Sequence, residues 1–595
     1  MFSVLDTSQI NDKVNFIRNF ISAKNAADGS AVDANSNVTQ KTMATLEAEL
    51  YKDYTIQLNR KLIYDKITEL YNRELADQYL EDLANHLIYT NDESSLKPYC
   101  ASVSMYPFLL EGTKCLGGTS GAPKNLQAFN GSFVNFVYQV ASDFAGAVAT
   151  VEYLHIFDWF ARKQYGKDYL KTNKKEIAQE LQGVVYALNQ PASARGHQSV
   201  FWNVSVFDDY YMKSMFGEFF YPDGTQVDFD SVMKLQKFFM EWFRLEREKE
   251  LLTFPVLTAS VLERKDRQGF MDESFVDYCA EEMAKGLSFF VYQSDSADSL
   301  SSCCRLRNEL ADNDFSYTLG AGGVVTGSCQ VITMNVNKLF QRFGGFKELP
   351  NLVSRLHKYL TAFKSLYKVY IDAGLIPSYT SGVMDLDKQF VTIGVNGIVE
   401  AAEYLGLEIS NNSEYKQFLS KFLGTIKDLN TQYRVTTGIK VNTECIPAEN
   451  LGVKNVKWDK ESGLKINRDC YNSYFYIVED DNSTILDKMA LHGKEVTNYL
   501  DGGSALHANF AHLLTKEQFY KLFKLAMKHG VPYWTFNVKM TCCSECGHID
   551  VETYDYCPKC GSEDIYYATR VIGYLKPVSK FSSARQEEEG RRHYM

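Results

Sequence analysis

The chain has 595 residues and a formal net charge of −11, with 45% hydrophobic and 23% charged residues. This composition is typical of a soluble globular protein, and the net charge argues against a protein that coats nucleic acid with its whole surface, because phosphates repel it. The sequence shows no run of 18 apolar residues and no signal peptide. We therefore expect a cytoplasmic protein without a membrane span, whose 13 cysteines are thiols, metal ligands or catalytic groups rather than structural disulfides.

Helical and strand patterns alternate along the chain. The polar segment 1–40 precedes a helical stretch from about 42 to 89, in which apolar residues recur every three or four positions. Strands are predicted around Cys100, at both ends of "GVVYALNQPASARGHQSVFWNVSVF", in "VVTGSCQVITMNV" and in "VTTGIKVNTEC". Further helices are predicted at 126–164, 229–251, 273–290 and 347–373. The alternation favours an α/β fold, and the length suits a barrel. We expect an N-terminal extension (1–40), one large unit (41–535) and a small C-terminal unit (536–595).

Two CxxC pairs close to the C-terminus indicate a metal site. Cys543 and Cys546 form one pair, Cys557 and Cys560 form the other, and each pair is followed by glycine. Four thiolates around Zn²⁺ make a closed, structural tetrahedron. Cys542 is expected to be a bystander, although it could compete with Cys543 as a ligand. A zinc ribbon either grips nucleic acid or holds a loop in place, and the many acidic residues of this ribbon favour the second role.

The segment that follows the cysteines contains a single glycine, Gly573, in "ATRVIGYLKP". An isolated glycine of this kind is ordinarily a turn residue. The chain then ends in "ARQEEEGRRHYM", where we expect Glu587–Glu589, Arg591 and Arg592 to form a solvated, charge-paired end.

This C-terminal pattern resembles that of the anaerobic (class III) ribonucleotide reductases, in which the matching glycine carries a radical. Other segments resemble family motifs in the same order along the chain: "LKPYCASVSMYPFL", "SSCCRLR", "VVTGSCQVITMNVNKLF", "CIPAENLGVK" and "YLDGGSALHANF". The resemblance implies a ten-stranded α/β barrel of the glycyl radical enzyme type. Its finger loop, near 300–306, and its glycyl radical loop would meet inside the barrel.

The resemblance also implies a radical reduction of ribonucleoside triphosphates to deoxyribonucleotides, the precursors of DNA. A separate activase with S-adenosylmethionine and an iron–sulfur cluster would place the radical on Gly573, which would take a hydrogen atom from Cys304. The Cys304 thiyl would abstract the ribose 3′-hydrogen. Glu449 would act as acid–base partner, Asn335 would bind the ribose hydroxyls, and Cys100 would supply reducing hydrogen.

The reductant and the regulation are left open by this resemblance. Some family members use formate and others a thioredoxin- or glutaredoxin-like dithiol protein, which would need a second thiol near Cys100. Cys445, four residues before Glu449, is our candidate, and an inert buried cysteine is the alternative; Cys303 and Cys329 also lie near motif positions. The resemblance begins too early in the chain to leave room for an ATP-binding regulatory domain. We expect a homodimer with nucleotide effectors bound around the helices of 126–164, and no direct nucleic-acid or membrane partner.

Two other functions compete with this one. The first is a different glycyl radical enzyme, such as a formate-lyase-like acyltransferase or a dehydratase, which the ribbon and "PAEN" argue against. The second is a non-catalytic zinc-ribbon protein that binds a partner or nucleic acid. The acidic surface and the collinear set of Cys100, Cys304 and Glu449 argue against it.

Overall fold

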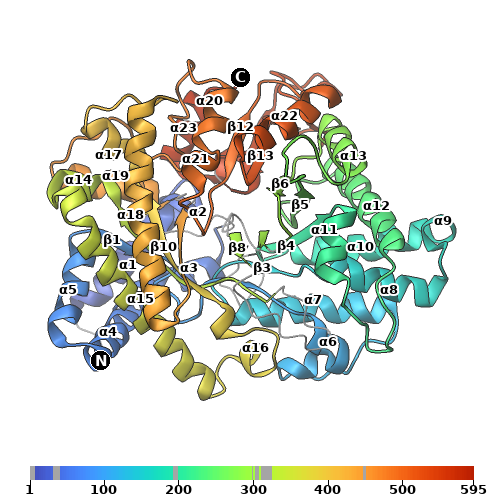
Figure 1. Ribbon diagram of the computed structural model, residues 1–595, viewed down its shortest axis with the longest axis horizontal. Coiled ribbons are helices and arrows are strands. Elements are labelled where there is room, and N and C mark those ends of the chain that lie inside the picture. The colour runs from blue at the N-terminus through green and yellow to red at the C-terminus, as the bar shows by residue number, and fades with distance from the viewer. Residues whose placement is uncertain are drawn as a thin grey trace.

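The protein was analysed as a computed structural model (Figure 1). The structure describes residues 7–30, 41–191, 199–297, 299–301, 307–309, 325–446, 450–571 and 573–595. The strands lie in the middle of the molecule and the helices surround them, in two groups on either side (Figure 1). Within the described ranges, no helix is long and apolar enough to cross a membrane.

Ten strands close into a barrel made of two halves. Within the first half all neighbouring strands are parallel, and its last strand, β6, pairs antiparallel with β13 of the second half. An antiparallel bridge between Ser102 and Thr326 joins the halves on the other side. A parallel bridge between Glu444 and Gly503 connects β11 to the segment that leads into β12. The first half contains β2 (Ala101–Ser102), β3 (Val148–Ala149), β4 (Trp202–Phe207), β5 (Val256–Leu262) and β6 (Phe290–Ser294), and the second contains β9 (Ser328–Asn335), β10 (Phe390–Asn396), β11 (Val441–Cys445), β12 (Leu506–Asn509) and β13 (Tyr533–Asn537). The predicted ten-stranded α/β barrel is confirmed.

Helices cover the outer face of this wall, and strand alternation then identifies the inner face. Trp202 of β4 packs against Phe133 of α7 and Tyr153 of α8, with ring centroids 5.7 and 5.4 Å apart. On the other half, the Thr443 hydroxyl of β11 accepts a hydrogen bond from Asn430 of α18 at 2.8 Å. The covering helices include α7 (Leu126–Asp143), α8 (Tyr153–Tyr165), α10 (Lys174–Leu188), α12 (Phe229–Arg247), α13 (Glu273–Ala284), α15 (Leu349–Asp372), α18 (Ser413–Thr437) and α22 (Lys516–His529).

Most predicted elements are present, with two clear errors. The stretch 126–164, predicted to be helical, is interrupted by the barrel strand β3 (Val148–Ala149) between α7 and α8. The stretch 42–89 forms α3 (Met43–Leu50), α4 (Lys52–Leu70) and α5 (Arg73–Ala84), and β1 (Ile88–Thr90) then pairs antiparallel with β9 outside the ring. The predicted strand at the start of "GVVYALNQ" is wrong, because these residues form the last turns of α10. Ile177, Leu181 and Leu188 are buried on that helix, so the short apolar run belongs to a helical stripe that begins earlier in the chain.

A small four-stranded sheet follows the barrel and carries the two CxxC pairs. Its strand order is β15–β14–β16–β17, and all three pairings are antiparallel. Because β16 and β17 pair through Arg570 and Leu575, the described residues Val571, Gly573 and Tyr574 lie in the turn of a hairpin. The strands are β14 (Met540–Cys543), β15 (Ile549–Asp550), β16 (Ile565–Arg570) and β17 (Leu575–Pro577), and helix α23 (Ser583–Arg591) ends the chain.

Candidate active site and metal centre

The structure brings the four predicted metal ligands together. All four Sγ atoms lie within 4.8 Å of one another. The distances are 3.6 Å from Cys543 to Cys560 and 3.7 Å from Cys546 to Cys557. A tetrahedral zinc with Zn–S bonds of about 2.3 Å requires sulfurs about 3.8 Å apart. The cluster therefore fits a structural zinc ion with all four positions taken by protein.

The residues beside the ligands explain why only four of the five neighbouring cysteines take part. Cys542 points to the opposite face of β14, where it packs with Met540 and Ile549, and burial raises the pKa of its thiol to about 11. The glycine after each CxxC pair, Gly547 or Gly561, has a φ of +69° or +76°. A side chain would be strained in that conformation, which the knuckle needs to turn back toward the sulfurs.

Gly573 is buried in the hairpin turn, and the turn is fixed to the end of the barrel. Tyr574 stacks on Phe201, directly before β4, with centroids 4.8 Å apart. The carbonyl of Val571 accepts a hydrogen bond from the Tyr474 hydroxyl at 3.4 Å. The carbonyl of Leu575 accepts a hydrogen bond from the Thr253 hydroxyl at 2.9 Å. The zinc ribbon and the barrel therefore hold the same short turn.

A buried arginine strengthens this attachment from the ribbon side. Arg570 donates to the hydroxyl and to the carbonyl of Ser288, directly before β6, and Arg247 donates to the same carbonyl at 2.9 Å. Burial lowers the pKa of Arg570 to about 10, so its guanidinium stays charged at neutral pH. Asn537, the last residue of β13, donates to the Arg570 carbonyl at 3.2 Å.

The C-terminal helix contradicts the prediction of a solvated end. Glu588 forms ion pairs with Arg585 and Arg592, and all three side chains are at least 96% buried. Arg592 also donates to the carbonyl of Arg570 at 3.4 Å. The charges are paired, as expected. They are buried rather than solvated, because the helix packs against the hairpin that carries Gly573. Glu589 is also buried and pairs with Lys539 at 3.2 Å, whereas Glu587 is exposed and the side chain of Arg591 is 46% exposed.

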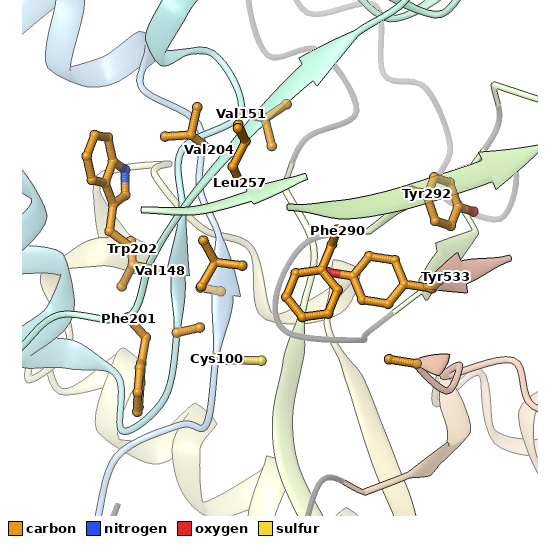
Figure 2. Packing of buried hydrophobic residues seen from close by; sticks show 14 of the residues in the cluster. Cys100, Val148, Val151, Phe201, Trp202, Val204, Leu257, Phe290, Tyr292 and Tyr533 are labelled. Atoms are coloured by element: carbon orange, nitrogen blue, oxygen red, sulfur yellow. The ribbon is translucent and has the colours of Figure 1, made fainter. Parts of the chain in front are cut away.

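Cys100 lies on the inner face of the barrel wall. Its neighbour Ala101 pairs with Val148 and, through it, with Trp202, which faces the helices, so Cys100 must face inward. Figure 2 shows its sulfur on the side of the wall away from Trp202. The Cys100 carbonyl accepts a hydrogen bond from Gln389 at 2.9 Å, and the thiol residue is 1% exposed. A side chain at Gly327, which has a φ of +144°, would lie 2.5 Å from that carbonyl, so the close approach of this strand requires glycine.

The predicted finger loop is flanked by two described strands. Strands β7 (Ser299–Ser301) and β8 (Arg307–Glu309) pair antiparallel directly after β6, and Figure 1 shows β8 near the centre of the molecule. Cys303, Cys304 and Glu449 lie outside the described residues.

Cys445 ends β11 and Asn335 ends β9, the two strands on either side of β10, but they have different surroundings. Cys445 lies on the face of β11 that also carries Thr443, and its thiol donates to the Ser473 carbonyl at 3.6 Å. Burial is the main cause of the raised pKa of Tyr415 on α18, and Glu400 and Cys445 add to it. The face of β11 that carries Cys445 is the helix-covered face. Asn335 caps α14 (Val336–Arg342) by accepting from the backbone of Lys338, and its amide donates to Asp459 at 3.0 and 3.1 Å. Both of its side-chain polar atoms therefore have partners inside the protein.

Sequence reasoning missed Tyr474 and Asn537, which help to fix the glycine turn and lie in no recognisable motif, and it placed Arg592 in a solvated end. Each of the three is brought to the turn by long-range packing. A surface cavity of about 370 Å³ lies beside α7, within the segment 126–164 around which the sequence predicted effector binding, and it is lined by Thr113, Gly118, Thr119, Ser120, Asn135, Tyr138, Gln139 and Ser142.

Comparison with known proteins agrees with this geometry. Residues 47–594 match the family model described as "Anaerobic ribonucleoside-triphosphate reductase". A solved structure titled "Anaerobic ribonucleotide reductase" is 28% identical, with a TM-score of 0.86 over 99% of this chain and 93% of that chain. The anaerobic ribonucleotide reductase from Thermotoga maritima in complex with dATP and CTP is 28% identical, with a TM-score of 0.84 over 98% of this chain and 94% of that chain. The same Thermotoga maritima enzyme with dATP bound in the specificity site gives a TM-score of 0.82 at 28% identity, over 97% of this chain and 94% of that chain. No curated protein matches the chain.

Proposed function

The chain belongs to the anaerobic ribonucleoside-triphosphate reductase family, and on that premise we propose that it reduces ribonucleoside triphosphates through a radical stored on Gly573. A Cα radical is stabilised by the amide nitrogen on one side and the carbonyl on the other, and only glycine flattens there without a side-chain clash. The observation that carries the proposal is the buried turn at Gly573, fixed between a four-cysteine ribbon and the end of the barrel.

The proposed reaction moves one hydrogen atom at a time. An activase that uses S-adenosylmethionine and an iron–sulfur cluster removes a hydrogen atom from Gly573. The glycyl radical takes a hydrogen atom from the Cys304 thiol, and the thiyl then takes the 3′-hydrogen of the ribose. The 2′-hydroxyl leaves as water after protonation, with Glu449 as the acid–base group. Two reducing equivalents then enter, beginning with a hydrogen atom from Cys100, and Cys304 returns the 3′-hydrogen.

The source of the reducing equivalents distinguishes two versions of this proposal. With formate, Cys100 is restored without a second protein thiol. With a dithiol protein, Cys100 forms a disulfide that the partner reduces. Cys445 was the candidate for that second thiol, but its position on the helix-covered face of β11 favours the inert role that we considered as the alternative.

Effector binding fits the cavity beside α7. The cavity is wide enough for a nucleotide, and hydroxyl and amide side chains supply its polar contacts. We assign it as the specificity site, because the Thermotoga maritima enzyme binds dATP at a specificity site and because α7 lies in the segment predicted for effector control. A homodimer would place this surface at or near the subunit contact.

The experiment that tests the function is anaerobic activation followed by electron paramagnetic resonance and turnover. We expect a glycyl doublet that is lost in Gly573→Ala, together with conversion of ribonucleoside triphosphates to 2′-deoxyribonucleoside triphosphates. A doublet without nucleotide reduction would instead favour a different glycyl radical enzyme. A protein that forms no radical with any competent activase would contradict the proposal.

A further inference from the structure

A buried carboxylate, Asp459 of α19 (Leu451–Glu461), is bonded to Asn335, the residue predicted to bind the ribose hydroxyls. It accepts hydrogen bonds from the Asn335 amide at 3.0 and 3.1 Å and from the Tyr471 hydroxyl at 2.6 Å, and it forms an ion pair with Lys338 at 3.1 Å. The side chain of Asp459 is 0% exposed and that of Lys338 is 3% exposed. The whole cluster is therefore shielded from water.

The last residues of two neighbouring strands, Asn335 of β9 and Asn396 of β10, lie side by side on the inner face of the barrel. The two residues pair with each other. Val395, directly before Asn396, pairs with Cys445, which lies on the helix-covered face of β11. Because side chains alternate along a strand, those of Asn396 and Asn335 point to the opposite, inner face. Cys100 lies on this face in the first half-barrel.

Helix α19 is fastened to both strand ends by two side chains that lie one helical turn apart. Asp459 bonds to Asn335, and Asn455 donates to the Asn396 side chain at 2.8 Å. The five buried residues of α19 include both of these polar residues, whereas the buried face of the covering helix α7 is almost entirely apolar. Apolar packing stabilises a helix contact at least as well as a buried ion pair does. The polar bonds of α19 therefore indicate a demand on geometry rather than on stability.

The carboxylate of Asp459 fixes the orientation of the Asn335 amide. The amide nitrogen lies against both carboxylate oxygens, while the amide carbonyl accepts a hydrogen bond from the backbone N–H of Lys338 at 3.0 Å. A flipped amide would place its carbonyl oxygen against the carboxylate and would lose these bonds, because neither oxygen can donate. In the orientation observed, the Asn335 carbonyl keeps a second lone pair, which can accept a hydrogen bond from a ribose hydroxyl.

We propose that Asp459 is a positioning residue for the reduction of the ribose, an inference that rests on the proposed function. It acts through Asn335, whose amide the family resemblance assigns to the ribose hydroxyls. Asp459 holds this amide in one orientation before the substrate binds, so that no binding energy is spent on ordering it. The ion pair with Lys338 in turn keeps the carboxylate from rotating away.

The test is a double-mutant cycle on kcat/KM in the full-length, activated protein. We expect Asp459→Asn to lower kcat/KM for the ribonucleoside triphosphates about tenfold to a hundredfold, the range that corresponds to the loss of a hydrogen bond to a charged group. Asn335→Ala should lose at least as much. The variant that carries both substitutions should lose no more than Asn335→Ala alone, because Asp459 acts through that amide. The yield of glycyl radical should equal that of the wild type in all three.

Two further variants separate positioning from folding. Asp459→Asn leaves the Lys338 ammonium buried without its carboxylate, whereas Lys338→Met combined with Asp459→Asn removes both charges. This combination should regain thermal stability relative to Asp459→Asn and keep the loss in kcat/KM. The matched control is Asp82→Asn on α5, because Asp82 is 2% exposed and accepts from Arg355 at 2.9 Å and from Tyr359 at 3.0 Å, both on the covering helix α15. The control should lower the melting temperature and leave kcat/KM unchanged.

The possible outcomes distinguish the inference from the function on which it rests. An unchanged kcat/KM in Asp459→Asn would overturn the inference and leave the function intact, as would a double variant that loses more than Asn335→Ala alone. Recovery of kcat/KM together with stability in the combined Lys338→Met and Asp459→Asn variant would also overturn it, since the loss would then come from the unpaired lysine. A wild-type protein that forms the radical but reduces no nucleotide would overturn the function itself.

Discussion

The buried ion pairs of the C-terminal helix give a quantitative prediction. Glu588 lies between Arg585 and Arg592, and the three side chains are almost fully buried. Burial alone would raise the pKa of Glu588, but the two arginines outweigh it and lower the pKa from 4.5 to about 2. A difference of that size corresponds to about 3 kcal/mol, which agrees with the usual cost of removing one partner from a buried pair.

The perturbation is Glu588→Gln, which leaves two buried guanidiniums without their carboxylate. Because Arg592 also holds the carbonyl of Arg570, the loss should appear as easier local opening of the glycine turn. We expect backbone hydrogen exchange in residues 566–577 to accelerate on the order of 100-fold, the factor that corresponds to about 3 kcal/mol. Hydrogen exchange with mass spectrometry measures this directly.

The matched control is Glu587→Gln, the same substitution on the exposed neighbouring residue. Equal exchange in the two variants would refute the reasoning. The pH dependence supplies a second check: a lowered carboxyl pKa stabilises the folded state above about pH 4.5 and loses that effect as the pH falls toward 2. The difference between wild type and Glu588→Gln should therefore shrink in acid.

Three other outcomes follow from the same structure. Removing the metal with a chelator, or the substitution Cys546→Ser, should lower the yield of glycyl radical about tenfold or more while the barrel stays folded, as circular dichroism would show; a full yield without metal would contradict the loop-holding role. Air should cut the activated chain at Gly573 and release residues 574–595, which gel electrophoresis detects, and Gly573→Ala should stay intact under the same treatment. Cys445→Ser should keep at least about half of the dithiol-driven turnover, since its thiol lies on the helix side of β11, whereas Cys100→Ser should abolish turnover; a dead Cys445→Ser would restore the disulfide hypothesis.

The sequence predicted the features that are coded locally. The CxxC spacing identified the four ligands, and the order of family motifs implied the ten-stranded barrel. The strand predicted at residues 183–188 was wrong, because a short apolar run fits a strand as well as a turn of a buried helix. The buried residues Ile177 and Leu181, earlier in the chain, are what reveal the helix. The prediction also failed at the C-terminus, because composition alone cannot show that Arg592 packs against the carbonyl of Arg570.

Strand alternation restricts which thiols can share chemistry with Cys100 more tightly than proximity in the sequence does. Cys445 was singled out because it precedes the "PAEN" motif, yet position in a motif says nothing about which face of a strand a side chain occupies. On β11 the inner positions are Asn442 and Glu444, because Thr443 bonds to a covering helix, so Cys445 faces outward while Cys100 faces inward. A disulfide between them would require the end of β11 to leave its pairing with β10. A dithiol mechanism in this barrel therefore needs a second thiol that enters from the inner side, whereas formate needs none.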